Sequence, residues 1–266
     1  MYSTSYHRAS SLDEAVRFLA DNEEAKALSG GQTLLPTMKQ RLAAPSHLVD
    51  LRHIAEMKGI AVDGKSVKIG AGMTHGEIMD SADIASVCPG LHQMAGLIGD
   101  PAVRHMGTLG GSLANNDPAA DYPAAILALD ATIHTNKREI KAQDFLAGLF
   151  ETALEDGELV TAVSFEAPEQ SGYEKFRNPA SRYAMCGVFV ARSGNAVRVG
   201  VTGAGSDGGF RWSEAEQALA SDFSPAALDG LSVDAGDMLS DLHGSAEYRA
   251  NLVKVMAKRA TAKAAG

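Results

Sequence analysis

Short apolar runs and one amphipathic segment alternate along the first fifty residues. Apolar side chains recur at helical spacing from residue 12 to residue 19, and Ser11 and Glu14 have the spacing of a capping box. Two short apolar runs, at 25–29 and 47–51, are typical of strands, and a second helical pattern separates them. The pattern predicts a unit in which strands and helices alternate.

Beyond this unit the pattern changes to paired short strands. Hairpins are predicted at 58–71, around an Asp-Gly turn, and at 131–140, around an Asn-Lys turn. Thr74 and Glu77 have the spacing of a second capping box. A further helix is expected to start at Asp117, which is followed by proline.

The last part of the chain reads as three strands and two helices. The strands are predicted at 173–177, 186–192 and 196–204, and the helices at 213–221 and 246–264. Three antiparallel strands with helices on one face would make a separate, small α+β unit.

Composition narrows the class of protein. The chain has 24 basic and 33 acidic residues and a net charge of −9, which argues against a nucleic-acid groove. No apolar run approaches ~20 residues, and the N-terminus lacks the apolar segment of a secretory signal. The two cysteines, Cys88 and Cys186, cannot form a disulfide framework or an iron–sulfur cage. We expect a cytoplasmic protein with no transmembrane segment and no nucleic-acid partner.

Glycine accounts for 27 of the 266 residues and is concentrated in three loops, SGGQT, GTLGGS and GAGSDGG. The last of these, from Gly203 to Gly208, matches the dinucleotide motif GxGxxG. That motif needs a second parallel strand after the following helix, whereas this chain is predicted to stay helical to its end. We interpret this loop as a turn between a strand and a helix.

The first glycine loop is a candidate anion site. Gly30 and Gly31 follow a predicted strand and precede a helix, where successive N–H groups can face an anion, and Thr33 adds a hydroxyl donor. No lysine occupies the position that a nucleotide-hydrolysing P-loop requires. A tight strand–helix turn without a ligand explains the same residues.

The second glycine loop offers more donors. Thr108 and Ser112 flank a glycine pair, and Asp121 follows in what reads as the first turn of a helix. Small donors and one carboxylate suit a ligand with phosphates and ribose hydroxyls, although an Asx-rich loop could satisfy its own backbone in the same way. None of the eight histidines has the helical spacing of a metal site, so no metal ligand is predicted.

Taken together, these motifs resemble a known family. GGQTLLP at 30–36, GTLGGSLA at 107–114, DPAAD at 117–121 and YEKFR at 173–177 resemble the FAD-binding medium subunit of the xanthine dehydrogenase/carbon monoxide dehydrogenase (molybdenum hydroxylase) family. DLHGSAEYR at 241–249 is similar to that family's C-terminal helix entry. The chain lacks the extra cysteine cluster that some members use for a further iron–sulfur centre.

The resemblance implies an α+β fold. It predicts an FAD-binding domain of the vanillyl-alcohol-oxidase/PCMH type, built from two α/β subdomains at 1–57 and 58–170. A small C-terminal α+β domain at 171–266, similar to that of carbon monoxide dehydrogenase flavoproteins, would carry a three-stranded antiparallel sheet with helices.

The resemblance also implies which residues hold FAD. Asp121 would accept hydrogen bonds from cofactor hydroxyls, and Arg177 would lie near the ring, where a positive charge favours reduced, anionic flavin. Neither a catalytic residue nor a metal ligand is expected in this chain. The diphosphate and ribityl region would be held by Ser29, Gly30, Gly31, Gln32, Thr33, Leu34, Thr108, Gly110, Gly111 and Ser112, and the flavin lined by Ile98, Gly99 and Leu159.

By the same resemblance, the chain is the FAD-carrying electron-transfer subunit of a three-subunit molybdenum hydroxylase. A small partner subunit with [2Fe-2S] clusters would deliver electrons, a large one would hold the molybdenum cofactor, and the assembly would be a dimer of heterotrimers. One alternative is a self-contained flavin oxidase or dehydrogenase of the same FAD-binding fold. Another is a structural adaptor that has lost FAD, against which the intact glycine pairs and Asp121 argue.

Overall fold

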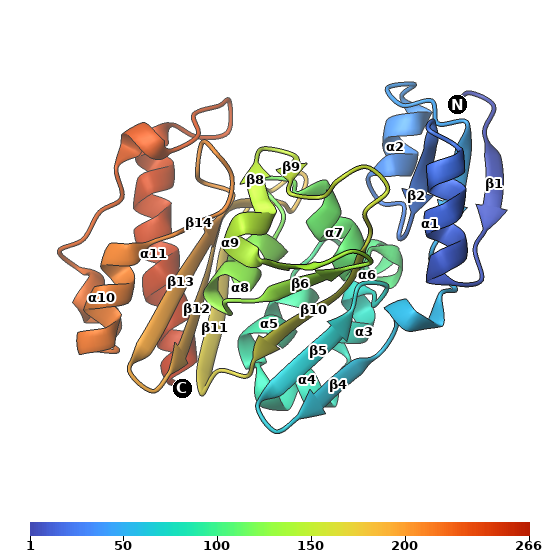
Figure 1. The fold of residues 1–266 in the computed structure, drawn as a ribbon. Coiled ribbons are helices and arrows are strands. Elements are labelled where there is room, and N and C mark those ends of the chain that lie inside the picture. Colours follow the sequence, from blue (N-terminus) through green and yellow to red (C-terminus); the bar gives the residue numbers. More distant parts are fainter.

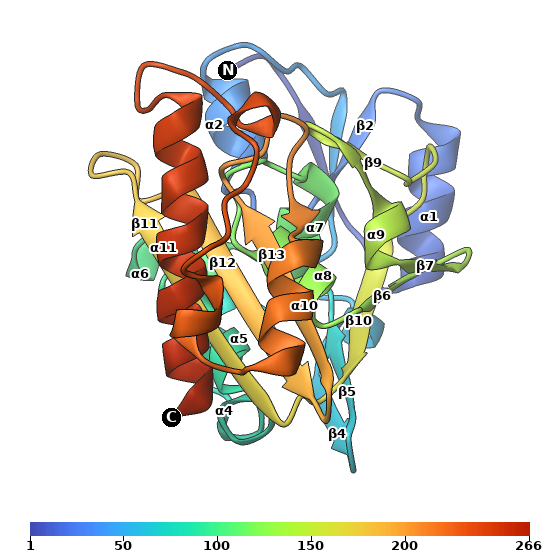
Figure 2. The same cartoon turned by 90° about the vertical axis from the view of Figure 1, so that its left-hand side faces the viewer.

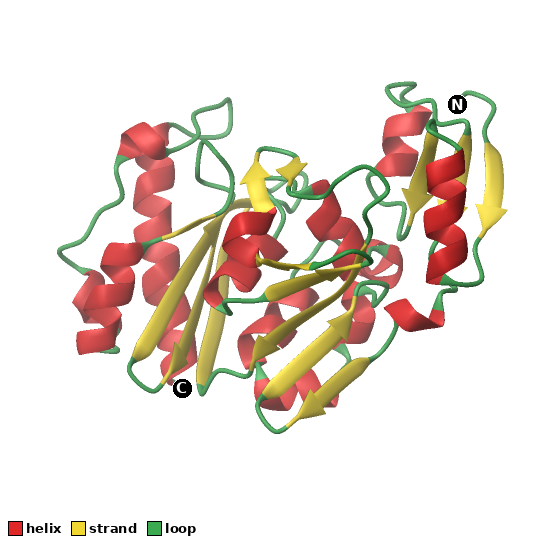
Figure 3. Ribbon diagram, viewed as in Figure 1, coloured by secondary structure: helices red, strands yellow, loops and turns green.

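The computed structural model describes residues 1–266 and contains three main β-sheets with helices packed around them (Figures 1 and 3). The first sheet is parallel, with β3 (His47–Asp50) between β1 (Ser5–Arg8) and β2 (Ala25–Leu28). The helices α1 (Leu12–Asp21) and α2 (Leu34–Lys39) belong to this unit.

The capping of α1 differs in one detail from the prediction. The Ser11 side chain caps the helix by accepting from the N–H of Glu14, as expected. The Glu14 carboxylate, however, accepts from the N–H of Ser10 rather than from that of Ser11. Because the Ser10 hydroxyl donates to the same carboxylate oxygen as the Ser10 N–H, Glu14 is held by Ser10 and does not close the capping box.

The second sheet is antiparallel, in the order β4-β5-β10-β6-β7. Both predicted hairpins lie in it. A short hairpin that was not predicted lies outside this sheet, after α9 (Ala142–Phe145). The strands of the second sheet are β4 (Ile60–Asp63), β5 (Ser66–Gly70), β6 (Thr132–Thr135), β7 (Glu139–Lys141) and β10 (Val160–Glu166). The short hairpin consists of β8 (Leu146–Gly148) and β9 (Glu151–Thr152).

Six short helices lie between β5 and β6. The predicted capping box of Thr74 and Glu77 is complete at the start of the first of them. The expected helix start at Asp117 is wrong, because its carboxylate accepts from the N–H of Ala119 in a turn and the helix begins only at Tyr122. The six are α3 (His75–Met79), α4 (Ala82–Val87), α5 (Pro89–Gly96), α6 (Pro101–Met106), α7 (Leu109–Asn115) and α8 (Tyr122–Ala128).

The third sheet has four strands rather than three. The three predicted strands are present as β11 (Gln170–Arg177), β12 (Ala184–Ser193) and β13 (Ala196–Thr202). The unpredicted fourth, β14 (Phe210–Arg211), has only two residues and no apolar alternation to reveal it. The helices α10 (Ser213–Ser221) and α11 (Ala246–Ala265) cover one face of this sheet, as Figure 2 shows.

Helix α8 packs between the second and third sheets. A Cβ atom at Gly200 of β13 would lie 2.0 Å from the carbonyl oxygen of Ala124, so α8 and this strand are in backbone contact. One apolar core includes Val49 of the first sheet, Ile69 of the second and Phe189 of the third. The strands of the three sheets span 5–50, 60–166 and 170–211, and the domain limits at 57 and 170 stay a prediction. No helix is both long and apolar enough to cross a membrane.

Candidate cofactor cleft

A cleft of about 710 Å³ opens between the N-terminal unit and the helices of the second sheet. This volume falls in the range of about 300–1,000 Å³ that is usual for ligand sites. Fourteen of the fifteen predicted FAD-contact residues line it, and Arg177 is the exception. Its walls come from the loop after β2, the α6–α7 segment, the start of β10 and the loop between β11 and β12.

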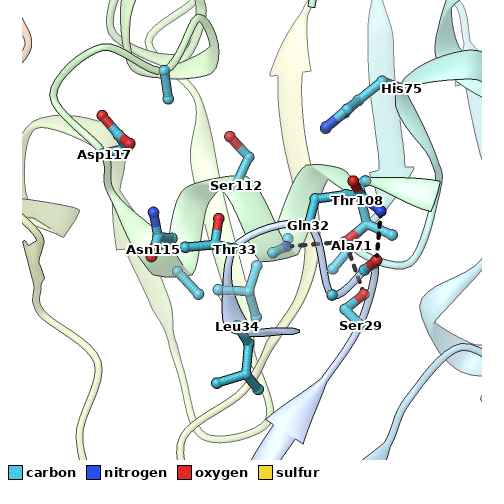
Figure 4. A pocket seen from close by; sticks show the side chains of 18 of the residues that line it. Ser29, Gln32, Thr33, Leu34, Ala71, His75, Thr108, Ser112, Asn115 and Asp117 are labelled. Atoms are coloured by element: carbon cyan, nitrogen blue, oxygen red, sulfur yellow. Dashed lines mark hydrogen bonds between the residues drawn. The ribbon is translucent and has the colours of Figure 1, made fainter. Parts of the chain in front are cut away.

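The loop from Ser29 to Leu34 presents unused backbone donors to the cleft. All six residues line it, and none of their N–H groups donates to an acceptor in the protein. Gly31 has φ +68°, a left-handed conformation that glycine adopts without strain. Consecutive N–H groups without protein acceptors form a cradle for an anionic ligand such as a diphosphate. Figure 4 shows this loop lying against α7.

The glycines of the two loops have different physical roles. A Cβ atom at Gly30 would lie 2.2 Å from the carbonyl oxygen of Met106, and one at Gly110 would lie 2.6 Å from the Cβ of Ala71. These two positions therefore allow close packing of backbone segments. At Gly111 the nearest atom is the Thr108 hydroxyl oxygen, 2.9 Å away, so this position keeps the space beside a polar side chain open.

A direct hydrogen bond joins the two glycine loops. Ser29 Oγ and Thr108 Oγ1 lie 2.8 Å apart, although 79 positions separate them in the sequence. Thr108 is also the N-cap of α7, because its hydroxyl accepts from the N–H of Gly111. The two loops predicted separately are thus one structural unit.

Helix α7 contributes two unbonded polar side chains to the cleft. Ser112 and Asn115 line the wall, and neither side chain has a hydrogen-bond partner in the protein. The helix ends at Asn115, and the side chain of its C-cap residue, Asn116, donates to the carbonyl oxygens of Gly148 and Glu151 and thereby holds the β8–β9 hairpin. Asn115, one of the small polar side chains that follow the second glycine pair, is free to contact a ligand.

Asp121 lies in the wall, but its carboxylate already has protein partners. The Tyr173 hydroxyl donates to Oδ1 over 2.6 Å, and Lys175 Nζ donates to Oδ2 over 3.0 Å. Burial raises the pKa of the Asp121 carboxyl, and the positive charge of Lys175 opposes that shift. A ligand hydroxyl would have to share an oxygen that is already hydrogen-bonded.

His75, which is not among the predicted site residues, faces the cleft from the first turn of α3 (Figure 4). Its Nδ1 lies 3.2 Å from the Tyr122 hydroxyl, and no protein group bonds its Nε2. Burial, aided by the charge of Arg104, lowers the His75 pKa to about 4, so the ring is neutral near pH 7. The signal that could have located it was the capping box of Thr74, which fixes where the helix starts.

The three predicted flavin-lining residues lie in the cleft, but Arg177 does not. Ile98, Gly99 and Leu159 line the cleft, whereas Arg177 is exposed at the end of β11 and does not. Its expected place near a flavin ring stays a prediction. Tyr183, from the loop after β11, lines the wall instead and was not anticipated.

The donor set of the cleft fits FAD. The unbonded N–H groups from Ser29 to Leu34 suit a diphosphate, and the side chains of Ser112 and Asn115 suit hydroxyl groups. Apolar side chains that would suit a planar ring system also line the cleft, among them Leu51, Met57, Ile98, Val103, Leu154 and Leu159.

Comparison with known proteins agrees with this chemistry. Residues 2–167 match the family described as "FAD binding domain in molybdopterin dehydrogenase". The chain is 36% identical to the carbon monoxide dehydrogenase medium chain of Afipia carboxidovorans, over 98% of this chain and 96% of that one. It is 34% identical to the glyceraldehyde dehydrogenase medium chain of Sulfolobus acidocaldarius, over 96% of each.

Solved structures show the same relationship. The reconstituted carbon monoxide dehydrogenase from Oligotropha carboxidovorans superimposes with a TM-score of 0.88 at 35% identity, covering 99% of this chain and 98% of that chain. Quinoline 2-oxidoreductase from Pseudomonas putida 86 gives 0.87 at 30% identity, with 99% and 97% covered. The chain belongs to the family of FAD-binding medium subunits of the molybdenum hydroxylases.

Proposed function

We propose that this chain binds FAD in the cleft and serves as the electron-transfer subunit of a three-subunit molybdenum hydroxylase. The observation that carries the proposal is the run of unbonded N–H groups from Ser29 to Leu34, held against Thr108 on the facing loop. Bound FAD would accept electrons from [2Fe-2S] clusters of a small subunit and pass them to an external acceptor. The large subunit would carry the molybdenum cofactor and the substrate pocket.

In this proposal the protein's own groups bind and orient the cofactor. The backbone cradle supplies hydrogen bonds to the diphosphate without a positive side chain, and Ser112 and Asn115 contact hydroxyl groups. His75, uncharged near neutral pH, adds one nitrogen that can bond an uncharged polar group of the ligand. The Asp121–Lys175 ion pair fixes the wall between α8 and β11.

The third sheet supports this role rather than that of a self-contained oxidase. The helix α11 packs on one side of β11 and β12, and α8 packs against β12 and β13. The core beneath α11 includes Val199, Trp212 and Met256, all buried, so this part of the chain is filled by its own side chains. The substrate cavity that an independent oxidase needs would have to lie elsewhere.

The complete complex would be a dimer of heterotrimers in the cytoplasm. The two cysteines, Cys88 and Cys186, are buried free thiols, which is typical of a reducing compartment. Expression of the tagged chain with the other two subunits tests the proposal. We expect flavin absorbance in the purified complex, and iron and molybdenum in fixed ratio to this chain. A preparation that contains both partners but no flavin would refute cofactor binding in the cleft.

A further inference from the structure

The most exposed large apolar side chain of the protein is held on a rigid turn. Leu242 is 90% exposed, at the tip of the segment that precedes α11. Beneath it, Arg249 is 3% exposed and donates from Nη2 to both carboxylate oxygens of Asp241, over 2.9 and 2.8 Å. Arg249 Nη1 donates to the carbonyl oxygens of Met185 and Gly203, both over 2.8 Å.

This arrangement fixes the direction in which Leu242 points. Asp241 Oδ1 also accepts from the N–H groups of His243 and Gly244, so the whole turn is hydrogen-bonded to one carboxylate. A buried guanidinium that donates to both oxygens of one carboxylate forms charge-assisted hydrogen bonds, which hold the turn in one geometry. A single exposed leucine needs no explanation, but one held on such a turn together with the exposed aromatic side chains of Tyr183 and Tyr248 indicates a surface that another molecule covers.

Leu242 is part of a larger surface around the end of β11 and β12. Tyr248, 41% exposed, packs edge-on against Phe176 with ring centroids 6.2 Å apart. A Cβ atom at Gly244 would lie 3.0 Å from the Tyr248 ring, so the turn and this aromatic pair are in contact. We call this region the tip surface and define it by Phe176, Arg177, Arg182, Tyr183, Leu242 and Tyr248.

The tip surface is continuous with the mouth of the cleft. Arg177 pairs with Ala184 at the last register position of β11 and β12, and the loop between them carries Arg182 and Tyr183. Both loop residues also line the cleft, and Tyr183 is 47% exposed. Figure 2 shows this loop beside the start of α11. A molecule seated on the tip surface would therefore stand at the cleft opening.

The charge of the tip surface is positive. Arg177 and Arg182 are exposed and have no carboxylate within 4 Å, in a chain whose net charge is −9. Arg182 lines the same cleft as Ile98 and Gly99. The hydrogen bond from the Val103 N–H and, to a smaller extent, the charge of Arg182 lower the pKa of the Asp100 carboxyl, which follows Gly99. Two unpaired guanidinium groups beside an apolar side chain favour a partner with acidic residues around an apolar centre.

We infer that the tip surface is the docking site for an acidic face of the small [2Fe-2S] subunit. The inference rests on the proposed function, since it names the partner of that electron-transfer site. An electron donor has to approach the cofactor closely, and the tip surface borders the cleft opening next to the predicted flavin-lining residues. Leu242 would insert into an apolar site on that partner, and Arg177 and Arg182 would pair with its carboxylates.

The test is assembly of the complete complex from co-expressed subunits, captured through a tag on this chain. We expect Leu242→Asp to weaken binding of the small subunit by about tenfold to hundredfold, so that iron per chain falls. The matched control is Leu42→Asp, because Leu42 is 75% exposed in the N-terminal unit, away from the tip surface. Arg177→Glu should also reduce iron per chain, and more strongly at low salt than at high salt.

Three outcomes distinguish failure of the docking inference from failure of the proposed function. Iron at the wild-type ratio in the Leu242→Asp complex, with an unchanged melting temperature, would overturn the inference. Loss of molybdenum with retention of iron would overturn it too, since the surface would then bind the large subunit. Failure of the proposed function looks different, because the wild-type chain itself would then lack flavin or fail to retain the iron-containing partner.

Discussion

Lys175 Nζ lies 2.9 Å from Asp121 Oδ1, and the two side chains are 0% and 5% exposed. The pair links the start of α8, in the wall of the cleft, to β11 of the third sheet. Tyr173, also on β11, donates to the same carboxylate. The cleft wall and the C-terminal sheet are therefore fastened to each other by one buried charge cluster.

We expect Asp121→Asn to destabilise the protein strongly. The change leaves Lys175 buried without a counter-charge, and breaking a buried pair in this way typically costs about 3–5 kcal/mol. Urea-induced unfolding measures the loss. The control is Asp130→Asn, whose exposed pair with Arg198 should contribute less than about 1 kcal/mol. Equal stability of the two variants would show that Lys175 is not buried as a cation.

Flavin binding should depend on Gly111. Gly111→Val places a branched side chain against Thr108 Oγ1 and beside the backbone cradle. Loss of the close contacts there should lower FAD affinity by about tenfold to hundredfold, or ~1.5–3 kcal/mol. Flavin per chain in the purified complex gives the result. Gly230→Val is the matched control, because no heavy atom lies within 4 Å of a Cβ at Gly230. Equal flavin content in both variants would contradict the assignment.

The hydrogen bond between the two loops should contribute to FAD affinity. Ser29→Ala and Thr108→Val each remove it, and Thr108→Val also removes the α7 N-cap, which costs about 1 kcal/mol of stability. If the bond positions the two loops, the double variant should lose less FAD affinity than the sum of the single losses, with a coupling of about 0.5–1.5 kcal/mol. Strictly additive losses would mean that the two loops act independently.

Stability should fall in mild acid because of His75. Its folded pKa is lowered from 6.5 to about 4 by burial, so below pH 6.5 the unfolded chain takes up a proton that the folded chain does not. Between those two values the contribution of this one group falls by up to about 1.4 kcal/mol per pH unit. His75→Gln should reduce the dependence of unfolding free energy on pH in this window. His243→Gln, at an exposed position, should leave it unchanged.

Short-range signals in the sequence predicted much of the fold and most of the cleft. Turn dipeptides marked both hairpins of the second sheet, and the glycine pairs marked the loops that form the cradle. These signals are local. Gly31 is needed because its backbone is left-handed, and Gly30 because no Cβ atom fits at its backbone contact. Neither requirement depends on how the rest of the chain folds.

Features that depend on long-range contacts were not predicted. His75 and Tyr183 reach the cleft through the packing of whole helices and strands. The capping box around His75 marks a helix start but not a ligand site, and Tyr183 lies in no recognisable motif. The partners of Asp121 are more than fifty positions away, so its buried ion pair could not be read from DPAAD. The helix after Asp117 starts late because that carboxylate caps a local turn instead.

The cradle from Ser29 to Leu34 has a consequence for how this protein can vary. Its hydrogen-bond donors are main-chain groups, so no side-chain truncation can delete them. Substitutions at positions such as Gln32 or Leu34 should be tolerated over evolutionary time, whereas a one-residue insertion or deletion would put every donor out of register. Loop length and the glycines, rather than side-chain identity, are therefore what selection has to preserve here.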